Sequence, residues 1–179
     1  LYLLGRFDEA EKVYAEFREA HQSHRNADAA ALRLAQVHHR RGAWKKALAA
    51  ARALTEAGEI AEDIAADTYF LVGDSHFRLD RWQEARKALS LFIRDKPEDD
   101  ARVATALVEL GIANVRLGET DSAITHFERL MKQYPDSPHC AVGYAELGRL
   151  LYENRQYAKG RKALEACIAL QPEGDQWPK

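Results

Sequence analysis

The chain has 179 residues, of which 46% are hydrophobic and 30% are charged, and its formal net charge at pH 7 is −2. Because acidic and basic residues are interspersed, the sequence offers no basic patch of the kind that binds nucleic acid. No apolar run approaches the roughly 18 residues that a membrane-spanning helix needs.

Apolar residues recur at helical spacing along the whole chain, which predicts an all-α protein without strands. The first expected helix covers residues 8–20 and carries the apolar stripe Ala10, Tyr14 and Phe17. The others are expected, in chain order, near residues 27–41, 44–57, 60–79, 82–95, 99–117, 120–133, 138–153 and 157–170. Asp99 or Asp100, and Ser137 followed by Pro138, are expected to cap the helices that begin near 99 and 138.

A six-residue tract marks the boundary between successive helices. Residues 5–10 return as 42–47, 80–85, 118–123 and, with less likeness, 155–160. The third residues of the tract are spaced 37, 38, 38 and 37 apart, and they are Phe7, Trp44, Trp82, Thr120 and Tyr157. Self-similarity at such a period identifies a solenoid, whose units are too small to bury their apolar faces alone. We call the helix before each tract helix A and the helix after it helix B.

Each full helix A has a small residue at the same phase of its stripe, namely Ala35, Gly73, Gly111 and Gly148. A glycine inside a helix costs about 1 kcal/mol relative to alanine. Three glycines at one phase therefore predict close helix–helix approach at that point.

The recurring aromatic, Leu-Gly, Ala and Pro positions together resemble tetratricopeptide repeats (TPRs). The resemblance covers the whole chain as a single array, with a half repeat at 1–22 and full repeats at about 27–59, 60–97, 99–135 and 138–172. It implies a right-handed superhelix of antiparallel helix pairs. Thr120, Gly160 and a period above 34 depart from the pattern. Because neither end has a polar capping repeat, we expect the array to be a fragment of a longer chain.

A narrower resemblance rests on residues 134–138 and the Leu147-Gly148 pair that follows them. This run is similar to TPR proteins of the bacterial cell envelope. It favours a periplasmic or envelope location, with the cytoplasm as the alternative.

Histidines are the first candidates for chemistry. His21 and His24 are three residues apart and could share a zinc ion, but no third ligand lies at a matching position. A solvated helix end, where His favours the dipole, is the competing interpretation. His38 and His76 share one phase of helix A and are expected to be interior packing residues. No nucleophile–base pair or Gly-rich phosphate loop occurs, so we expect no enzyme activity, no metal and no cofactor.

The two cysteines lie on the buried stripes of the last helix pair. Cys140 begins helix A, and Cys167 lies at the same end of the antiparallel helix B. An axial offset of roughly 4–5 Å, at 1.5 Å per residue, puts a disulfide within reach. Two buried free thiols are the alternative.

The TPR resemblance implies that a peptide or an amphipathic helix binds along the concave face formed by the A helices. The matching positions are Leu32, Gln36, His39, Arg40, Phe70, Asp74, Phe77, Arg78, Val108, Ile112, Val115, Arg116, Ala145, Arg149, Tyr152 and Glu153. The apolar members are expected to form an exposed groove. Leu32 and Gln36 replace the first residues of the clamp that binds chaperone tails, which disfavours those ligands.

Arg40, Arg78 and Arg116 recur every 38 residues beside this groove. Such a ladder could bind carboxylate or phosphate groups bidentately. A basic residue that suits the helix dipole is the alternative reading.

The sequence thus predicts a non-catalytic protein–protein interaction module with an apolar, Arg-edged groove. Two alternatives remain open. One is the regulatory or substrate-docking arm of a larger enzyme, and the other is a scaffold that associates with a second copy of itself.

Overall fold

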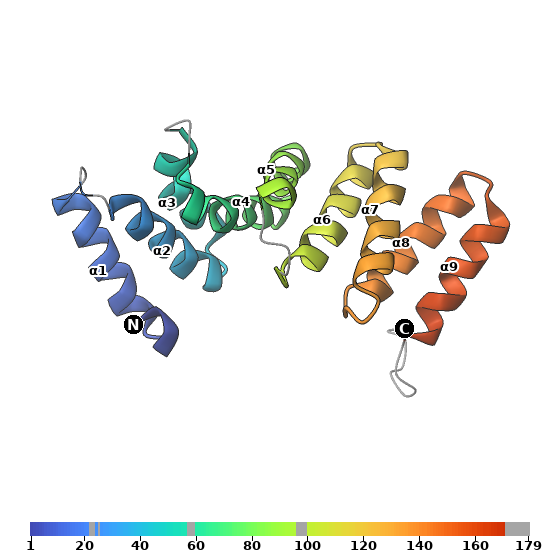
Figure 1. Cartoon of the computed structure of the whole chain (residues 1–179), viewed down its shortest axis with the longest axis horizontal. Coiled ribbons are helices and arrows are strands. Elements are labelled where there is room, and N and C mark those ends of the chain that lie inside the picture. Colours follow the sequence, from blue (N-terminus) through green and yellow to red (C-terminus); the bar gives the residue numbers. More distant parts are fainter. Residues whose placement is uncertain (22–23, 25, 57–59, 96–99, 171–179) are drawn as a thin grey trace. The chain divides into compact units, whose positions relative to one another are not determined.

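The computed structural model describes residues 1–21, 24, 26–56, 60–95 and 100–170 (Figure 1). These residues form a short 3₁₀ turn, η1 (Tyr2–Leu4), and the helices α1 (Phe7–Ala20), α2 (Ala27–Arg40), α3 (Trp44–Glu56), α4 (Glu62–Phe77), α5 (Trp82–Asp95), α6 (Val103–Arg116), α7 (Thr120–Gln133), α8 (Cys140–Glu153) and α9 (Tyr157–Ala169). No strand occurs among them, so the all-α prediction is confirmed. None of the helices in this part of the chain has both the length and the apolar character needed to cross a bilayer.

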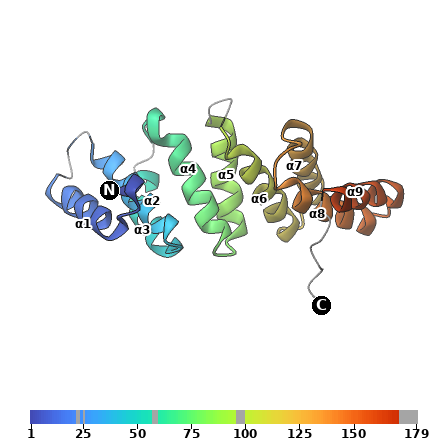
Figure 2. The ribbon, with the colours of Figure 1, turned by 90° about the horizontal axis from the view of Figure 1, so that it is seen from below.

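The chain folds into two compact units, residues Leu1–Asp100 and Ala101–Lys179. In unit 1, α2 packs against α3 and α4 against α5, while α1 covers α2 and α3 covers α4. Helices α4 and α5 lie side by side in Figure 1 and again in the view turned by 90° (Figure 2). In unit 2, α6 pairs with α7 and α8 with α9, and α7 packs on α8. Each pair is an A helix followed by its B helix, as the repeat predicts.

The first residue of each tract explains why the A and B helices turn back on each other. All five of these residues have a left-handed backbone, with φ between 56° and 76°, and they are Gly5, Gly42, Asp80, Gly118 and Arg155. In the turn at Gly42, its N–H donates to the His39 carbonyl and the next N–H donates to that of His38, each at 2.9 Å. The left-handed residue closes these bonds, and glycine adopts it without steric cost.

Close packing of A on B occurs where the glycines predicted it. A Cβ atom placed on Gly73 would lie 2.6 Å from Cγ of Leu89, and one on Gly111 would lie 2.3 Å from Cε1 of Phe127. Gly148 faces a leucine of α9 in the same way, at 2.6 Å. The prediction of close helix approach is therefore confirmed.

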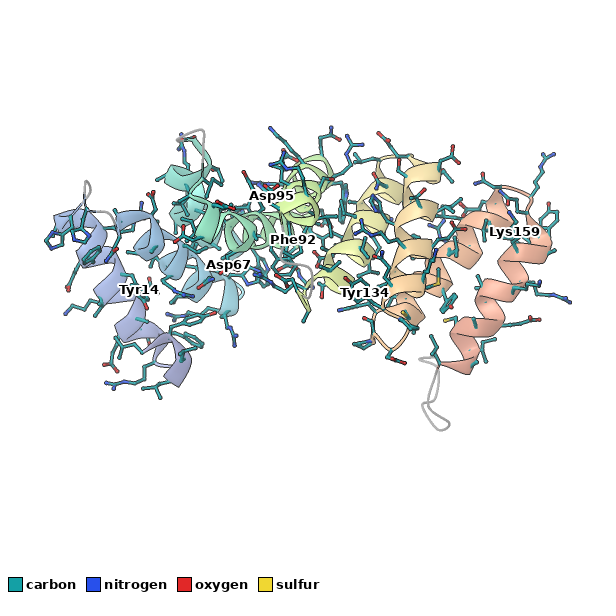
Figure 3. The ribbon with its side chains drawn as sticks, viewed as in Figure 1. Tyr14, Asp67, Phe92, Asp95, Tyr134 and Lys159 are labelled. Carbon is teal, nitrogen blue, oxygen red and sulfur yellow. The ribbon has the colours of Figure 1, made fainter. Side chains whose placement is uncertain are left out.

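Large apolar side chains of the B helices fill the space beside these glycines. Phe92 of α5, labelled in Figure 3, and Phe127 of α7 are both fully buried. Phe92 also packs on Phe70 of α4, with ring centroids 5.1 Å apart. The stripes assigned to α3, α5 and α7 are thus core residues.

The helix expected near 138–153 begins at Cys140, close to the prediction, whereas the helix expected near 99–117 begins later, at Val103, because a turn at 101–102 precedes it. Arg102 and His139 are the residues before α6 and α8, and neither helix has a side-chain cap. Cys140 N–H donates to the Ser137 carbonyl at 3.0 Å. This bond closes a separate turn over Pro138 and is not part of the hydrogen bonds within α8. Ser137 Oγ accepts a bond from His139 N–H, outside the helix. Asp99 lies outside the described residues.

Candidate partner-binding surface

The surface assigned from the sequence falls on both units, so it is described as two faces. The A-helix face of unit 1 consists of the assigned residues of α2 and α4, and that of unit 2 consists of those of α6 and α8. Within each helix the assigned residues lie four, seven and eight positions after the first of them, and helix periodicity brings residues at this spacing onto adjoining sides of the helix.

A buried carboxylate is the centre of the A-helix face of unit 1. Asp74 of α4 is 3% exposed. Its Oδ2 accepts from Nε2 of His39 on α2 at 2.5 Å, and its Oδ1 accepts from Nε of Arg78 at 3.0 Å. Charged acceptors make hydrogen bonds roughly twice as strong as neutral ones. This network fixes His39 and Arg78 and ties the two A helices together.

The aromatic residues of the unit 1 face are only partly available. Phe70 and Phe77 are half-buried, because Phe70 packs on Phe92 and Phe77 packs edge-on against Trp82 at 5.4 Å. Leu32 is 2% exposed and belongs to the core of the unit. The expectation that Leu32 contributes to an exposed apolar lining is therefore wrong.

Two arginines occupy equivalent, exposed positions on this face. Arg40 Nε donates to the Tyr2 hydroxyl at 3.0 Å, and its guanidinium lies 5.5 Å from the centre of the Tyr2 ring. Arg78 is held by Asp74, as described above. A guanidinium has five N–H donors, and the hydrogen bond of Arg40 to Tyr2 uses one of them. Gln36 accepts from Arg33 of the same helix at 2.8 Å.

The A-helix face of unit 2 has a different composition. Ile112 and Val115 are half-buried and Arg116 is exposed, whereas Val108 is 5% exposed and contributes no open surface, contrary to expectation. On α8, Tyr152 is 62% exposed.

Arg149 on the same helix forms ion pairs with two residues of α8, Glu146 at 2.9 Å and Glu153 at 2.6 Å. The hydrogen bond to Glu146 is the main cause that raises the pKa of Arg149; burial opposes it, and the hydrogen bond to Glu153 adds to the increase.

Aromatic pairs across four of the five A/B turns are a feature that the sequence analysis missed; the turn between α6 and α7 has Val115 and Thr120 at these positions. The pairs are edge-on, with centroids 6.2, 4.9, 5.4 and 5.0 Å apart, and they are Tyr2/Phe7, His39/Trp44, Phe77/Trp82 and Tyr152/Tyr157. Both members are five residues apart in every case, and this spacing was the available signal. Three residues assigned to partner binding, His39, Phe77 and Tyr152, therefore also stabilise the turns.

The histidines of the A helices are packing residues. His38 is 8% exposed, and burial lowers its pKa while Glu11 opposes this effect. Burial likewise lowers the pKa of His76, and Nδ1 of His76 has no hydrogen-bond partner in the described part of the chain. Both side chains are therefore neutral at pH 7, as expected for interior positions.

The other candidates for chemistry do not form sites. His21 and His24 stack on Phe17 with centroids at 4.9 and 5.5 Å. No group of three metal-ligating side chains converges within the residues described.

Cys140 and Cys167 are free thiols, so the disulfide considered above is not formed in this structure. Each donates instead to a backbone carbonyl, that of Tyr134 at 3.1 Å and that of Ala141 at 3.3 Å, respectively. Burial raises the pKa of the Cys140 thiol.

Comparison with family models gives one consistent result. Three models, each described as tetratricopeptide repeat, match residues 1–62, residues 67–99 with 105–137, and residues 141–173. Together these matches cover nearly the whole chain. A search of curated protein sequences gives no match.

Solved structures share the fold at low sequence identity. A crystal structure of MamA is 21% identical, with a TM-score of 0.76 over 94% of this chain and 90% of that chain. YrrB, described as a TPR protein with an unusual peptide-binding site, is 20% identical, with a TM-score of 0.76 over 96% and 83%. BtubC from P. vanneervenii is 18% identical, with a TM-score of 0.63 over 98% and 77%.

Proposed function

The chain belongs to the tetratricopeptide repeat family, and from this premise we propose that it binds a peptide segment of another protein on its A-helix faces. TPR proteins are in general interaction modules without catalytic activity. The proposed ligand has a carboxylate for the arginines and apolar side chains for the half-buried aromatics. The peptide-binding site named for YrrB supports this class of ligand.

The observation that carries the proposal is the pair Arg40 and Arg78. These residues occupy the same repeat position on neighbouring A helices of one unit, and each is exposed. Each guanidinium is held by a contact within the unit, so it loses little conformational entropy when it binds a ligand. Exposed, oriented guanidinium groups are suited to bidentate recognition of carboxylates.

Half-buried apolar side chains of the same unit provide the remaining binding energy. Phe70 and Phe77 of α4 both retain exposed area. Burial of apolar area contributes about 25 cal/mol per Å², from which the cost of ordering the peptide is subtracted. We therefore expect modest affinity for a single short peptide.

Selection of peptides from a random phage-displayed library, followed by fluorescence anisotropy with the selected sequence, tests the proposal. We expect acidic residues to be enriched among the selected peptides. Arg40→Gln and Arg78→Gln should each weaken binding about tenfold, because each removes a charge-assisted hydrogen bond. Binding should also weaken with salt, since the contact is exposed.

Lys45→Gln is the matched control, because Lys45 is an exposed cation on helix B, away from the A-helix face. This variant should bind like the wild type. If both Arg variants also bind like the wild type, the A-helix face of unit 1 is not the binding site.

Self-association is a second candidate, favoured by exposed apolar residues on α9. Leu164 is 40% exposed and Ile168 is 64% exposed, whereas the residues equivalent to Leu164 in α5 and α7, Leu89 and Phe127, are fully buried. We expect sedimentation velocity to show concentration-dependent association that Ile168→Glu removes. A monomer at all concentrations would dismiss this candidate.

A further inference from the structure

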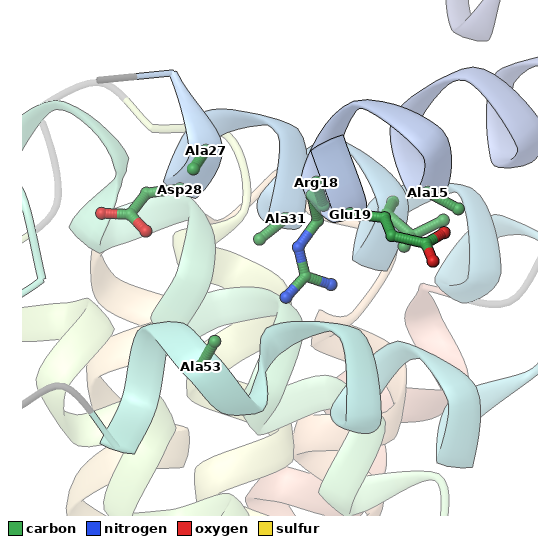
Figure 4. A pocket seen from close by; sticks show the side chains of 8 residues that line it. Ala15, Arg18, Glu19, Ala27, Asp28, Ala31 and Ala53 are labelled. Carbon is green, nitrogen blue, oxygen red and sulfur yellow. The ribbon is translucent and has the colours of Figure 1, made fainter. Parts of the chain in front are cut away.

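A cavity of about 520 Å³ is lined by residues of α1, α2 and α3, and none of its lining residues belongs to the A-helix face (Figure 4). Four alanines and Leu34 form much of its lining. We call it the α1–α3 cavity. Its volume falls within the usual range for sites that hold a small molecule or a peptide side chain.

The cavity exists because one repeat position is small here. Ala31 of α2 lines it, whereas the equivalent residues of the other full repeats are Tyr69, Leu107 and Tyr144. A missing tyrosine side chain leaves space that the surrounding helices have not closed. The equivalent cavity above α4, which Tyr69 lines, has a smaller volume of about 360 Å³.

A single charged residue distinguishes this cavity further. Arg18 of α1 points into it, toward Ala53 of α3 (Figure 4). The equivalent residues of the other repeats are uncharged, namely Thr55, Ile93, Met131 and Ile168. Arg18 is half-buried, and no hydrogen bond or ion pair joins it to another residue that the structure describes. A half-buried guanidinium in apolar surroundings favours an anionic partner.

The rim of the cavity limits which anion fits. Glu19 and Asp28 also line it, and both are exposed. These carboxylates disfavour a ligand of high negative charge and favour positive charge beside the bound group. The cavity therefore suits a ligand whose single carboxylate lies deep, next to Arg18, and whose cationic groups lie at the rim.

We propose that the α1–α3 cavity binds an acidic side chain of a peptide, with basic residues on either side of it in the peptide sequence. The carboxylate pairs with Arg18, the methylene groups of the acidic side chain pack on Ala31 and Leu34, and the flanking cations lie near Glu19 and Asp28. This site is separate from the A-helix face and does not require that face to bind anything.

Two short labelled peptides test the inference by fluorescence anisotropy. The first is acetyl-Lys-Ala-Glu-Ala-Lys-amide, and the second has Gln in place of Glu. We expect the wild-type chain to bind the Glu peptide about tenfold more tightly than the Gln peptide. Arg18→Gln should remove this preference. Ala31→Tyr, which restores the bulk found in other repeats, should abolish binding of both peptides.

Arg52→Gln is the control, because Arg52 is an exposed cation of α3 that pairs with Glu56 and does not line the cavity. This variant should bind the Glu peptide like the wild type. The inference is overturned if the wild type binds neither peptide, if it does not distinguish them, or if Arg18→Gln keeps the preference. Circular dichroism melts identify a variant that has failed to fold, and Arg18→Gln decides the outcome if Ala31→Tyr does not fold.

Discussion

Units 1 and 2 are built from the same repeat, yet they connect their A helices differently. In unit 1 the buried Asp74 accepts hydrogen bonds from both A helices. In unit 2 a hydrogen bond at 3.0 Å joins the Thr105 hydroxyl of α6 to the ring of His139, which precedes α8. The repeat therefore fixes the apolar positions and the turns, while the polar positions of the A helices differ from one unit to the other.

The turns between paired helices show the same contrast. In unit 1, Trp82 is half-buried beside Phe77, whereas in unit 2 Tyr157 is 54% exposed beside the exposed Tyr152. More apolar area is thus removed from water at the unit 1 turn. The four predictions below compare the two units, starting from this largest difference.

Trp82→Ala should destabilise unit 1 by about 2–4 kcal/mol, because it deletes a large, partly buried aromatic side chain and the edge-on contact to Phe77. Tyr157→Ala should cost unit 2 about 1 kcal/mol or less, since its ring is mostly solvated. Urea unfolding followed by hydrogen exchange of each unit measures both effects. Equal losses for the two variants would contradict the comparison.

Asp74→Asn should cost about 1.5–3 kcal/mol, because the amide keeps the shape but removes the charge from two part-buried hydrogen bonds. The control in unit 2 is Glu153→Gln, which disrupts an exposed pair with Arg149 four residues earlier. That change should cost at most about 0.5 kcal/mol. Denaturant midpoints at constant slope report both values. A loss for Asp74→Asn as small as that of the control would show that the network does not stabilise unit 1.

Acid should lower the folding stability of unit 1 through His38 and His76, and that of unit 2 through His126. Burial is the main cause that lowers the pKa of each of these groups below 6.5. Carboxylates of Glu11 and Glu84 oppose the effect at His38 and His76, whereas Arg129 adds to it at His126. Arg41 and Lys46 also lower the pKa of His38, and Arg81 lowers that of His76.

A lowered pKa means that the folded state binds fewer protons than the unfolded state. The stability that these groups confer is therefore present above pH 6.5 and is lost as the pH falls through the folded pKa values. Thermal melts between pH 7.5 and 5 should show this decline, and His126→Gln should flatten it in unit 2. A melting temperature of the His126→Gln variant that falls as steeply as the wild type would rule out a role for this group.

Most of the fold follows from the sequence because its signals are local. The period, the apolar stripes and the three A-helix glycines each report contacts between helices that are adjacent in the chain. The expected Ser137 cap of α8 is not formed, because Ser137 and Pro138 suit both a helix cap and an isolated turn.

The candidate site is less predictable for a physical reason. Whether Phe70 lies open or packs on Phe92 depends on how deep the A helix sits against its B helix, which periodicity does not specify. The Asp74 network joins residues 35 positions apart, and no local pattern reveals such a pair. The α1–α3 cavity depends on Ala31 and Arg18 together, and it becomes visible only when equivalent positions of the repeats are compared in the structure.

The smallest expected effect concerns the two turns that lack glycine, one in each unit. Asp80 and Arg155 have φ angles of 56° and 60°, which cost a residue with a side chain about 1 kcal/mol. Glycine removes this strain but gives the unfolded chain more freedom, so the net gain is about 0.5 kcal/mol. Aspartate tolerates the left-handed region better than arginine. Arg155→Gly in unit 2 should therefore stabilise more than Asp80→Gly in unit 1, and Gly118→Ala should destabilise. If Arg155→Gly lowers the melting temperature, the turn in unit 2 must instead be stabilised by contacts of the arginine side chain.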